Sequence, residues 1–224
     1  MQEVQKVDLM IATPGYSLMS SYVKSLLDTV AELSKRGITW GFSNQYASHV
    51  ADAREVTLSG TQENSVVENR PFQGLVEYKK ILWIDSDIAW KPEDVIKLYE
   101  SDEDIVSGAY LLATGEVTAY PIALKRALTY DEVLPMTEPM KVGAIGFGFV
   151  CIKKGVFESL SRPWFQSAIT TIEVDGKDYT FPIIGEDISF CERARANGYD
   201  IWFDPTVRVT HHKTMKLTWE GIKP

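Results

Sequence analysis

The sequence predicts an α/β protein built on a mostly parallel, doubly wound sheet. Short apolar runs typical of buried strands alternate with segments whose apolar residues recur at helical spacing, from residue 7 to about residue 110. The first run, residues 7–12, is almost continuously apolar, as expected for a parallel strand covered on both faces. Beyond about residue 115 the alternation gives way to short strand-like segments, which indicates a mixed, β-richer second half.

The first half of the chain is expected to alternate strands with three helices. Residues 17–36 carry apolar residues at helical spacing, and Gly37 follows as a C-terminal cap. A second helix is expected over residues 47–58, and a third begins near Lys91, where Pro92 opens the first turn. The strands between these helices are expected at residues 38–42, 80–84 and 104–110.

The second half is expected to contain a hairpin and one more helix. Asp175-Gly176 lies between β-rich flanks and predicts the hairpin turn, and the helix should span residues 186–196 before Gly198. Strands are expected at residues 117–124, 145–153, 201–203 and 207–211. Because no repeat, low-complexity tract or linker divides the sequence, we expect a single domain over residues 1–224, with its halves meeting near residue 114.

The charge balance favours small ligands over nucleic acid. The chain has 23 basic and 31 acidic residues, a net charge of −8 and a pI of about 5.0. This balance argues against a broad nucleic-acid or anionic-membrane surface, although it leaves a local basic patch or a modified DNA substrate open. Cys151 and Cys191 lie within apolar strand and helix patterns, so we expect two reduced thiols in the core.

No targeting or membrane-spanning segment is visible in the sequence. The first residues lack a basic region followed by a long apolar stretch, and no apolar run reaches the roughly 18 residues that span a bilayer. We therefore predict a soluble cytoplasmic protein.

The sharpest local motif is Asp85-Ser86-Asp87, which follows the strand expected at residues 80–84. In open parallel sheets, ligands bind beyond the carboxyl ends of the strands. Two carboxylates at this spacing could converge on Mg²⁺ or Mn²⁺, which would bridge them to a diphosphate. The alternative is a solvated acidic turn that caps the helix beginning near Pro92.

Glu186 and Asp187 begin the helix expected at residues 186–196. Acidic residues in a first turn interact favourably with the helix dipole and cap free N–H groups, which is their structural interpretation. In the functional interpretation, one of them is a general base that removes a proton from an acceptor hydroxyl.

Three other residues are candidates for ligand binding. His211 and His212 follow an alternating strand, and two of the three histidines of the chain lying in tandem at a strand end suggest a metal ligand. We choose His211 as that ligand. Arg54, on the second helix, is either an exposed salt-bridging residue or a bidentate contact to a phosphate or nucleotide.

Taken together and in order, these segments resemble a GT-A-fold glycosyltransferase, nearest to the family 2-like enzymes of bacteria and large viruses. The resemblance covers most of the chain. It rests on residues 10–14, 51–54, 81–88, 146–152, 185–187 and 198–205, and on His211.

The resemblance implies a metal-dependent hexosyl- or deoxyhexosyltransferase that uses a UDP- or GDP-linked sugar and Mn²⁺ or Mg²⁺. Residues 1–114 would bind the nucleotide, and residues 115–224 would bind the acceptor, which is a polysaccharide, a glycoprotein glycan or modified DNA. A viral member of this family would act in the cytoplasm of its host.

The resemblance also assigns individual roles. Around the nucleotide, the implied contacts are Thr13 and Pro14 beside the base and ribose, Asn44 on the base and Arg54 in the same pocket. Asp85 would contact the ribose and metal-bound water, and Ser86 is placed among the donor-binding residues. The implied metal ligands are Asp85, Asp87 and His211. On the acceptor side, Asp187 corresponds to the catalytic base of inverting enzymes, and Glu186 would face the acceptor.

Two departures and three rival classes accompany this resemblance. Glu55 replaces the asparagine that often follows the arginine, and His212-Lys213 replaces a glycine-bearing segment. A nucleotidyltransferase would need a glycine-rich basic loop after the first strand, and a DxD phosphatase would need a lysine at a strand end. A non-catalytic carbohydrate-binding protein would use exposed aromatics, with candidates at Trp83, Trp90, Trp164, Trp202 and Trp219.

Overall fold

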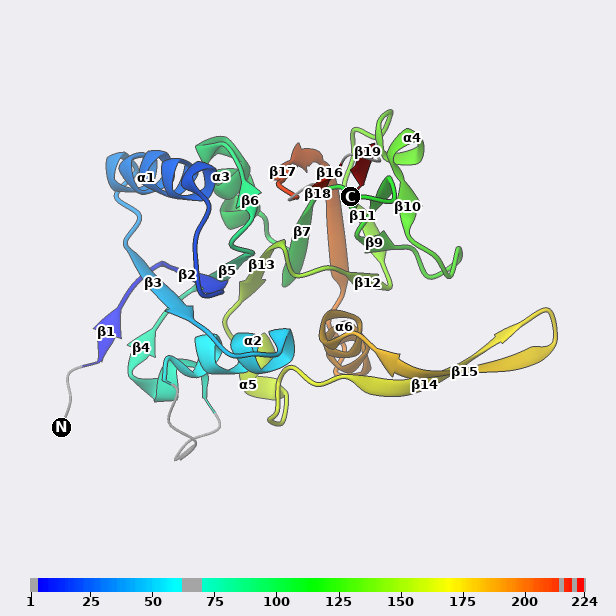
Figure 1. Cartoon of the computed structure of the whole chain (residues 1–224). Coiled ribbons are helices and arrows are strands. Elements are labelled where there is room, and N and C mark those ends of the chain that lie inside the picture. Colours follow the sequence, from blue (N-terminus) through cyan, green and yellow to red (C-terminus); the bar gives the residue numbers. More distant parts are fainter. Residues whose placement is uncertain (1–3, 62–69, 214–215, 219–220, 224) are drawn as a thin grey trace.

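The protein is organised around one seven-stranded sheet (Figure 1). The computed structural model describes residues 4–61, 70–213, 216–218 and 221–223. Along the sheet the strands follow the order β11, β16, β7, β13, β5, β2, β3. Their bounds are β2 (Leu9–Pro14), β3 (Trp40–Gln45), β5 (Lys80–Ile84), β7 (Ile105–Ala109), β11 (Met140–Val142), β13 (Phe149–Lys153) and β16 (Ile201–Arg208).

The sheet is mostly parallel, as the sequence predicts. Strands β3, β2, β5, β7 and β16 run in one direction, because β2 is parallel to β3 and β5, and β16 is parallel to β7. Strand β13 lies between β5 and β7 and is antiparallel to both, and β11 is antiparallel to β16 at the edge. The carboxyl ends of five strands therefore meet at one edge of the sheet, where open α/β folds bind their ligands.

Helices cover both faces of the sheet (Figure 1). Helices α1 (Ser20–Lys35) and α3 (Pro92–Glu100) lie on one face. On the other face lie α2 (Val50–Ser59), α5 (Val156–Ser159) and α6 (Glu186–Ala196). The two covered faces explain why central strands such as β2 and β5 are buried along their whole length and do not alternate with exposed polar residues.

Successive residues of a strand enter two different cores. Leu9 and Ile11 of β2 pack with residues of α1 and α3, whereas Met10 and Ala12 pack with residues of α2, α5 and α6. This division follows from the period of two along a strand. Cys151 and Cys191 are both buried and free, which confirms the predicted reduced core thiols.

Short paired strands and turns surround the main sheet. The pairs are β1 (Gln5–Lys6) with β4 (Val76–Glu77), β8 (Glu116–Val117) with β10 (Leu128–Thr129), β9 (Ala119–Tyr120) with β12 (Ala144–Ile145), β6 (Ile88–Ala89) with β17 (Thr210–His211), and β18 (Lys216–Thr218) with β19 (Gly221–Lys223). A 3₁₀ helix (Pro71–Gly74) and the short helix α4 (Tyr130–Val133) complete the described elements.

A long hairpin leads into the start of α6. Strands β14 (Ala168–Val174) and β15 (Lys177–Ile184) pair antiparallel and extend away from the body of the protein (Figure 1). The predicted turn at Asp175 and Gly176 is confirmed, with φ values of 51° and 73° at the two residues. Positive φ at both central positions matches the right-handed twist of the flanking strands.

The second half contains three irregularities that the sequence pattern does not predict. The segment 117–124 is not one strand, because residues after Pro121 turn back and the Leu124 N–H donates to the Pro121 carbonyl. Residues 146–148 separate β12 from β13. Strand β16 continues through Pro205, where the sequence pattern predicts a break between two strands. Its pairing with β7 shifts register between Asp204 and Arg208. A proline is tolerated within a strand at such a bulge.

In the part of the chain that the structure describes, no helix has the length and apolar character needed to cross a bilayer. Trp219 lies outside the described residues.

Candidate active site

An open cleft of about 540 Å³ lies beyond the carboxyl ends of the parallel strands. Loops after β2, β3, β5 and β7, the segment after β16 and the first turn of α6 all contribute to its walls. The lining residues are Pro14, Gly15, Tyr46, Ala47, Ser48, Val50, Ala53, Asp85, Ser86, Asp87, Tyr110, Leu112, Thr118, Tyr120, Asp187, His211 and Lys213. Residues from both halves of the sequence therefore meet in one space.

The Asp87 carboxylate contacts the side chains of His211 and Lys213 in the cleft. Its Oδ2 atom lies 3.2 Å from Nε2 of His211 and 2.9 Å from Nζ of Lys213. Burial would raise the pKa of Asp87, but the hydrogen bonds from His211 and Lys213 outweigh it and lower the pKa to about 2. Asp87 is thus an ionised acceptor at neutral pH.

Backbone pairing brings His211 to Asp87. Strand β17 pairs antiparallel with β6, which places His211 opposite Ile88, and the His212 N–H donates to the Asp87 carbonyl at 2.8 Å. The His211 ring donates from Nδ1 to the Leu111 carbonyl at 2.8 Å, so Nε2 points toward Asp87. The structure therefore brings His211, rather than His212, into the cleft wall.

Two glycines make room for the tyrosine that supports His211. The Tyr110 ring meets the His211 ring edge-on at 5.3 Å, and its hydroxyl accepts a hydrogen bond from the Gly148 N–H. A Cβ at Gly146 would lie 2.2 Å from that hydroxyl, and one at Gly148 would lie 2.7 Å from the tyrosine ring. The Gly-Phe-Gly sequence at residues 146–148 is thus required by the close approach of Tyr110.

Asp187 is a carboxylate with a strongly raised pKa. Burial is the main cause, and the negative charge of Glu186 adds to it, so the pKa of Asp187 rises from 3.8 to about 6. Its Oδ1 atom accepts the Ile188 N–H at 2.8 Å in the first turn of α6. Gly185 precedes this turn, and a Cβ there would lie 2.7 Å from Oδ1 of Asp187. A base with a pKa near neutrality is suited to proton abstraction.

Arg54 lies beneath the cleft and does not line it. The residue is 4% exposed. Its Nη2 atom lies 2.9 Å from Oδ1 of Asp85, and its Nε atom lies 3.0 Å from Oε1 of Glu186. Glu186 is itself buried on this arginine. Contacts of Arg54 with the nucleotide and of Glu186 with the acceptor stay predictions, because the described partners of the two side chains are internal.

Of the residues expected around the nucleotide, some line the cleft and others are buried beneath it. Pro14 and Ser86 line the cleft. Thr13 is fully buried, and its hydroxyl bonds to that of Tyr22. Asn44 donates to the carbonyls of Thr13 (2.8 Å) and Gly15 (3.0 Å), so it fixes the turn that ends β2.

The donor set on Asp87 and His211 fits a divalent cation. A carboxylate oxygen and an imidazole nitrogen are ligands of Mn²⁺, and the Leu111 carbonyl orients the imidazole as an outer-shell partner does in metal sites. Among the described residues, no group of three or more His, Cys, Asp or Glu side chains is close enough to hold a metal ion. Two protein ligands suit a cation that completes its coordination with phosphate oxygens and water.

Several cleft residues carry no signal that would single them out in the sequence. Lys213 lies in a segment that reads as a departure from the family pattern, yet it contacts Asp87. Tyr110 and Tyr120 line the cleft from segments that read as ordinary strand residues. Only the pairing of distant strands reveals these positions.

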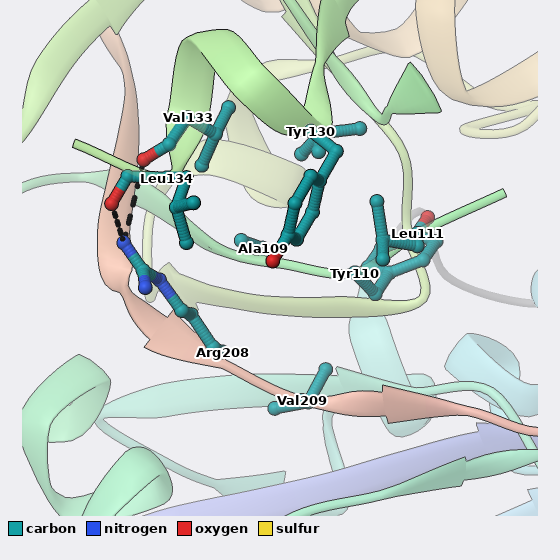
Figure 2. A pocket seen from close by; sticks show the side chains of 9 residues that line it. Ala109, Tyr110, Leu111, Tyr130, Val133, Leu134, Arg208 and Val209 are labelled. Atoms are coloured by element: carbon teal, nitrogen blue, oxygen red, sulfur yellow. Dashed lines mark hydrogen bonds between the residues drawn. The ribbon is translucent and has the colours of Figure 1, made fainter. Parts of the chain in front are cut away.

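A second pocket shares Tyr110 with the cleft but differs in chemistry (Figure 2). It has a volume of about 160 Å³. Its other lining residues are Ala109, Leu111, Val117, Tyr130, Val133, Leu134, Arg208 and Val209. Arg208 donates to the Val133 and Leu134 carbonyls at 3.3 and 2.9 Å, as Figure 2 shows. The lining is apolar apart from Arg208 and the tyrosine hydroxyls, and the described residues that form it include no carboxylate, histidine or cysteine.

Comparisons with known proteins define the fold. No protein-family model and no curated protein matches the sequence. Among solved structures, A197 from STIV is similar over 96% of this chain and 97% of its own length, with 17% identity and a TM-score of 0.51. The catalytic domain of Drosophila beta1,4galactosyltransferase 7, solved with xylobiose, is similar over 94% of this chain and 72% of its own length, with 14% identity and a TM-score of 0.50.

The fold is therefore the GT-A fold of glycosyltransferases. The mixed central sheet, the helices on both of its faces and the match to a galactosyltransferase catalytic domain agree on this assignment. At these identities the similarity concerns the fold, and the chemistry has to be argued from the cleft.

Proposed function

We propose that this protein is a metal-dependent glycosyltransferase that moves a sugar from a nucleotide-sugar donor to a hydroxyl of an acceptor glycan. One observation carries the proposal. A single cleft at the carboxyl edge of the sheet is lined by Asp85, Asp87 and His211 together with the high-pKa Asp187. Ionised oxygens for a cation and a base near neutrality are the two elements that such a transfer needs.

The donor would bind along the loops after β2, β3 and β5. Pro14 and Ser86 line that part of the cleft, and Asn44 and Thr13 shape the turn beside it. A UDP- or GDP-linked sugar is the proposed donor. Lys213, also in the cleft, adds a positive charge that a diphosphate would attract.

Asp87 and His211 would hold Mn²⁺ or Mg²⁺, with Asp85 close by on the same loop. When bound, a divalent cation stabilises negative charge that develops on the leaving diphosphate. The side chains of the protein would orient the donor between the two walls of the cleft, so that the anomeric carbon faces Asp187.

Asp187 would act as the general base of an inverting transfer. The acceptor oxygen attacks the anomeric carbon as the bond from that carbon to the diphosphate oxygen breaks. The proton of the acceptor hydroxyl passes to Asp187, and the nucleoside diphosphate leaves with the bonding electron pair. The raised pKa of Asp187 makes its carboxylate a better proton acceptor than an ordinary aspartate.

Three of the tryptophans named above do not favour a carbohydrate-binding protein without catalysis. Trp83 and Trp164 are fully buried, and Trp90 is 7% exposed, so none of the three offers a ring face to a sugar. The acidic and histidine side chains of the cleft are a better guide to function than the aromatic content.

The proposal is tested by incubating the protein with UDP- and GDP-sugars and Mn²⁺, with and without a panel of glycan acceptors, and in parallel with a phosphoester. We expect release of nucleoside diphosphate that acceptor accelerates, and no release of inorganic phosphate from the phosphoester. Saturable sugar binding with no donor turnover, or phosphate release alone, would overturn the proposal. The Asp187→Asn variant is the control for contaminating activity.

A further inference from the structure

Arg54 is a buried cation that joins two acidic segments far apart in the sequence. Its guanidinium contacts Asp85, 31 residues away, and Glu186, 132 residues away. The Nη1 atom also donates to the Phe147 carbonyl at 3.5 Å. The arginine thus spans from the loop after β5 to the first turn of α6.

Aromatic rings enclose the guanidinium. The Trp83 and Phe147 ring centroids lie 5.9 and 5.5 Å from its central carbon. Burial by itself would lower the pKa of Arg54, but the charges of Asp85 and Glu186 outweigh burial and raise it. The side chain is therefore always charged and depends on both carboxylates for compensation, because an unpaired charge in such surroundings is strongly unfavourable.

The two carboxylates stand at opposite sides of the proposed reaction. Asp85 begins the loop that carries Asp87, whose Oδ2 atom contacts His211. Glu186 immediately precedes Asp187 and begins the same helix. Because Arg54 holds both, a shift of either segment would break an ion pair of this buried arginine.

The neighbouring Glu55 provides a contrast on the same helix. It accepts hydrogen bonds from Nε of Arg162 at 2.6 Å and from the Trp164 N–H at 2.9 Å. Glu55 thus anchors a loop outside the cleft, which explains the departure from the family pattern at this position. Arg54 and Glu55 are consecutive, and each forms ion pairs with little exposure to solvent. Only Arg54 binds Asp85 and Glu186.

We propose that Arg54 is a positioning residue that fixes the metal-side loop and the base-bearing helix relative to each other. This inference rests on the proposed function, since it assigns Asp187 and the loop after β5 to one reaction. The guanidinium binds Asp85 and Glu186 at once, and its planar fork makes this geometry rigid in a way that a lysine cannot reproduce. In this role Arg54 acts through Asp85 and Glu186, and a contact with substrate is not required.

Kinetics of Arg54→Met, Arg54→Lys and Glu55→Gln test the inference. For Arg54→Met we expect kcat to fall about 100-fold with a donor KM within about threefold of wild type, because a displacement of about 1 Å costs this much in rate. Arg54→Lys should recover part of kcat, since it keeps the charge but loses the fork. Glu55→Gln should lower stability and leave kcat within about twofold.

A kcat for Arg54→Met near the wild-type value would overturn the inference. An equal loss of kcat in Glu55→Gln at matched stability would overturn it too, because any destabilised α2 would then suffice. If Arg54→Met does not fold, Arg54→Lys carries the kinetic test alone: we expect about a tenfold loss of kcat, and an unchanged kcat contradicts the inference.

A second measurement needs no activity. Chemical-denaturation midpoints of Arg54→Lys, Asp85→Asn, Glu186→Gln and the two double variants form two mutant cycles. We expect both cycles to be non-additive, each carboxylate variant shifting the midpoint less in the Arg54→Lys background. Additive midpoints in either cycle refute the double link. A wild-type protein without donor turnover refutes the proposed function, whereas the cycles still report on Arg54.

Discussion

Asp187→Asn should slow transfer by orders of magnitude and at the same time stabilise the fold. The folded protein raises the pKa of Asp187 from 3.8 to about 6, so folding disfavours its charged form. Asparagine has the same shape, and its side-chain oxygen can still accept the Ile188 N–H that Asp187 accepts at 2.8 Å. The substitution therefore removes a half-buried charge without removing the contact at the start of α6.

The size of the stabilisation follows from the pKa shift. A rise of about 2 pKa units corresponds to at most about 3 kcal/mol at neutral pH, and partial solvent contact reduces this to about 1–3 kcal/mol. For a chain of this size, at about 2–4 °C per kcal/mol, the Tm should rise by about 2–12 °C. The gain should grow as pH increases from about 4 to about 6 and vanish below about pH 4, where Asp187 is protonated in both states.

Two assays on the same preparation check this prediction. Thermal unfolding of wild type and Asp187→Asn at several pH values measures the stability difference, and nucleoside diphosphate release with acceptor measures transfer. The rate should fall about 10²- to 10⁴-fold, as expected for loss of a general base, while the donor still binds. A variant that transfers sugar at the wild-type rate, or that is less stable at neutral pH, contradicts the assignment of Asp187 as a half-buried, high-pKa base.

Three further predictions concern the same cleft. For wild type, kcat/KM should fall about tenfold per pH unit below about pH 6, because Asp187 must be ionised; a flat profile down to pH 4 would exclude it as the base. Gly185→Ala should lower kcat about tenfold with little change in Tm, since its Cβ would displace Oδ1 of Asp187; circular dichroism and kinetics separate the two effects. His211→Ala should raise the Mn²⁺ concentration needed for half-maximal activity about 10-fold or more, and an unchanged requirement removes His211 from the metal site.

The fold was predictable because the physics that shapes it is local. Strands covered on both faces must be apolar throughout, so the runs at residues 7–12 and 80–84 stand out in the sequence, and the alternation of Leu9 and Met10 between two cores follows from strand geometry. The antiparallel entry of β13 between β5 and β7 was not predicted, because direction depends on partners far away in the chain.

The acidic residues and the histidine of the cleft were visible in the sequence because they follow strand ends or begin a helix. The structure places Asp85, Asp87, Asp187 and His211 in one cleft, as the order of parallel strands allows. Their catalytic and metal-binding roles stay predictions.

The buried supports of the cleft could not be found in the same way. In the sequence, Arg54 looks like an ordinary arginine on the surface of a helix. Only the fold shows that it pairs with carboxylates 31 and 132 residues away. Likewise, the need for glycine at residues 146 and 148 depends on Tyr110, which arrives from a different strand. Such contacts are properties of the packed chain.

The central claim is that Asp87 and its neighbours gather a cation and a nucleoside diphosphate in the cleft. Thermal unfolding with UDP and GDP, each with and without Mn²⁺, tests this claim most directly, because a ligand that binds the native state raises its apparent stability. We predict that at least one of the two raises the Tm only when Mn²⁺ is present, and that Asp87→Asn loses this rise. If neither nucleotide raises the Tm with Mn²⁺, or if Asp87→Asn responds as wild type does, the claim is wrong.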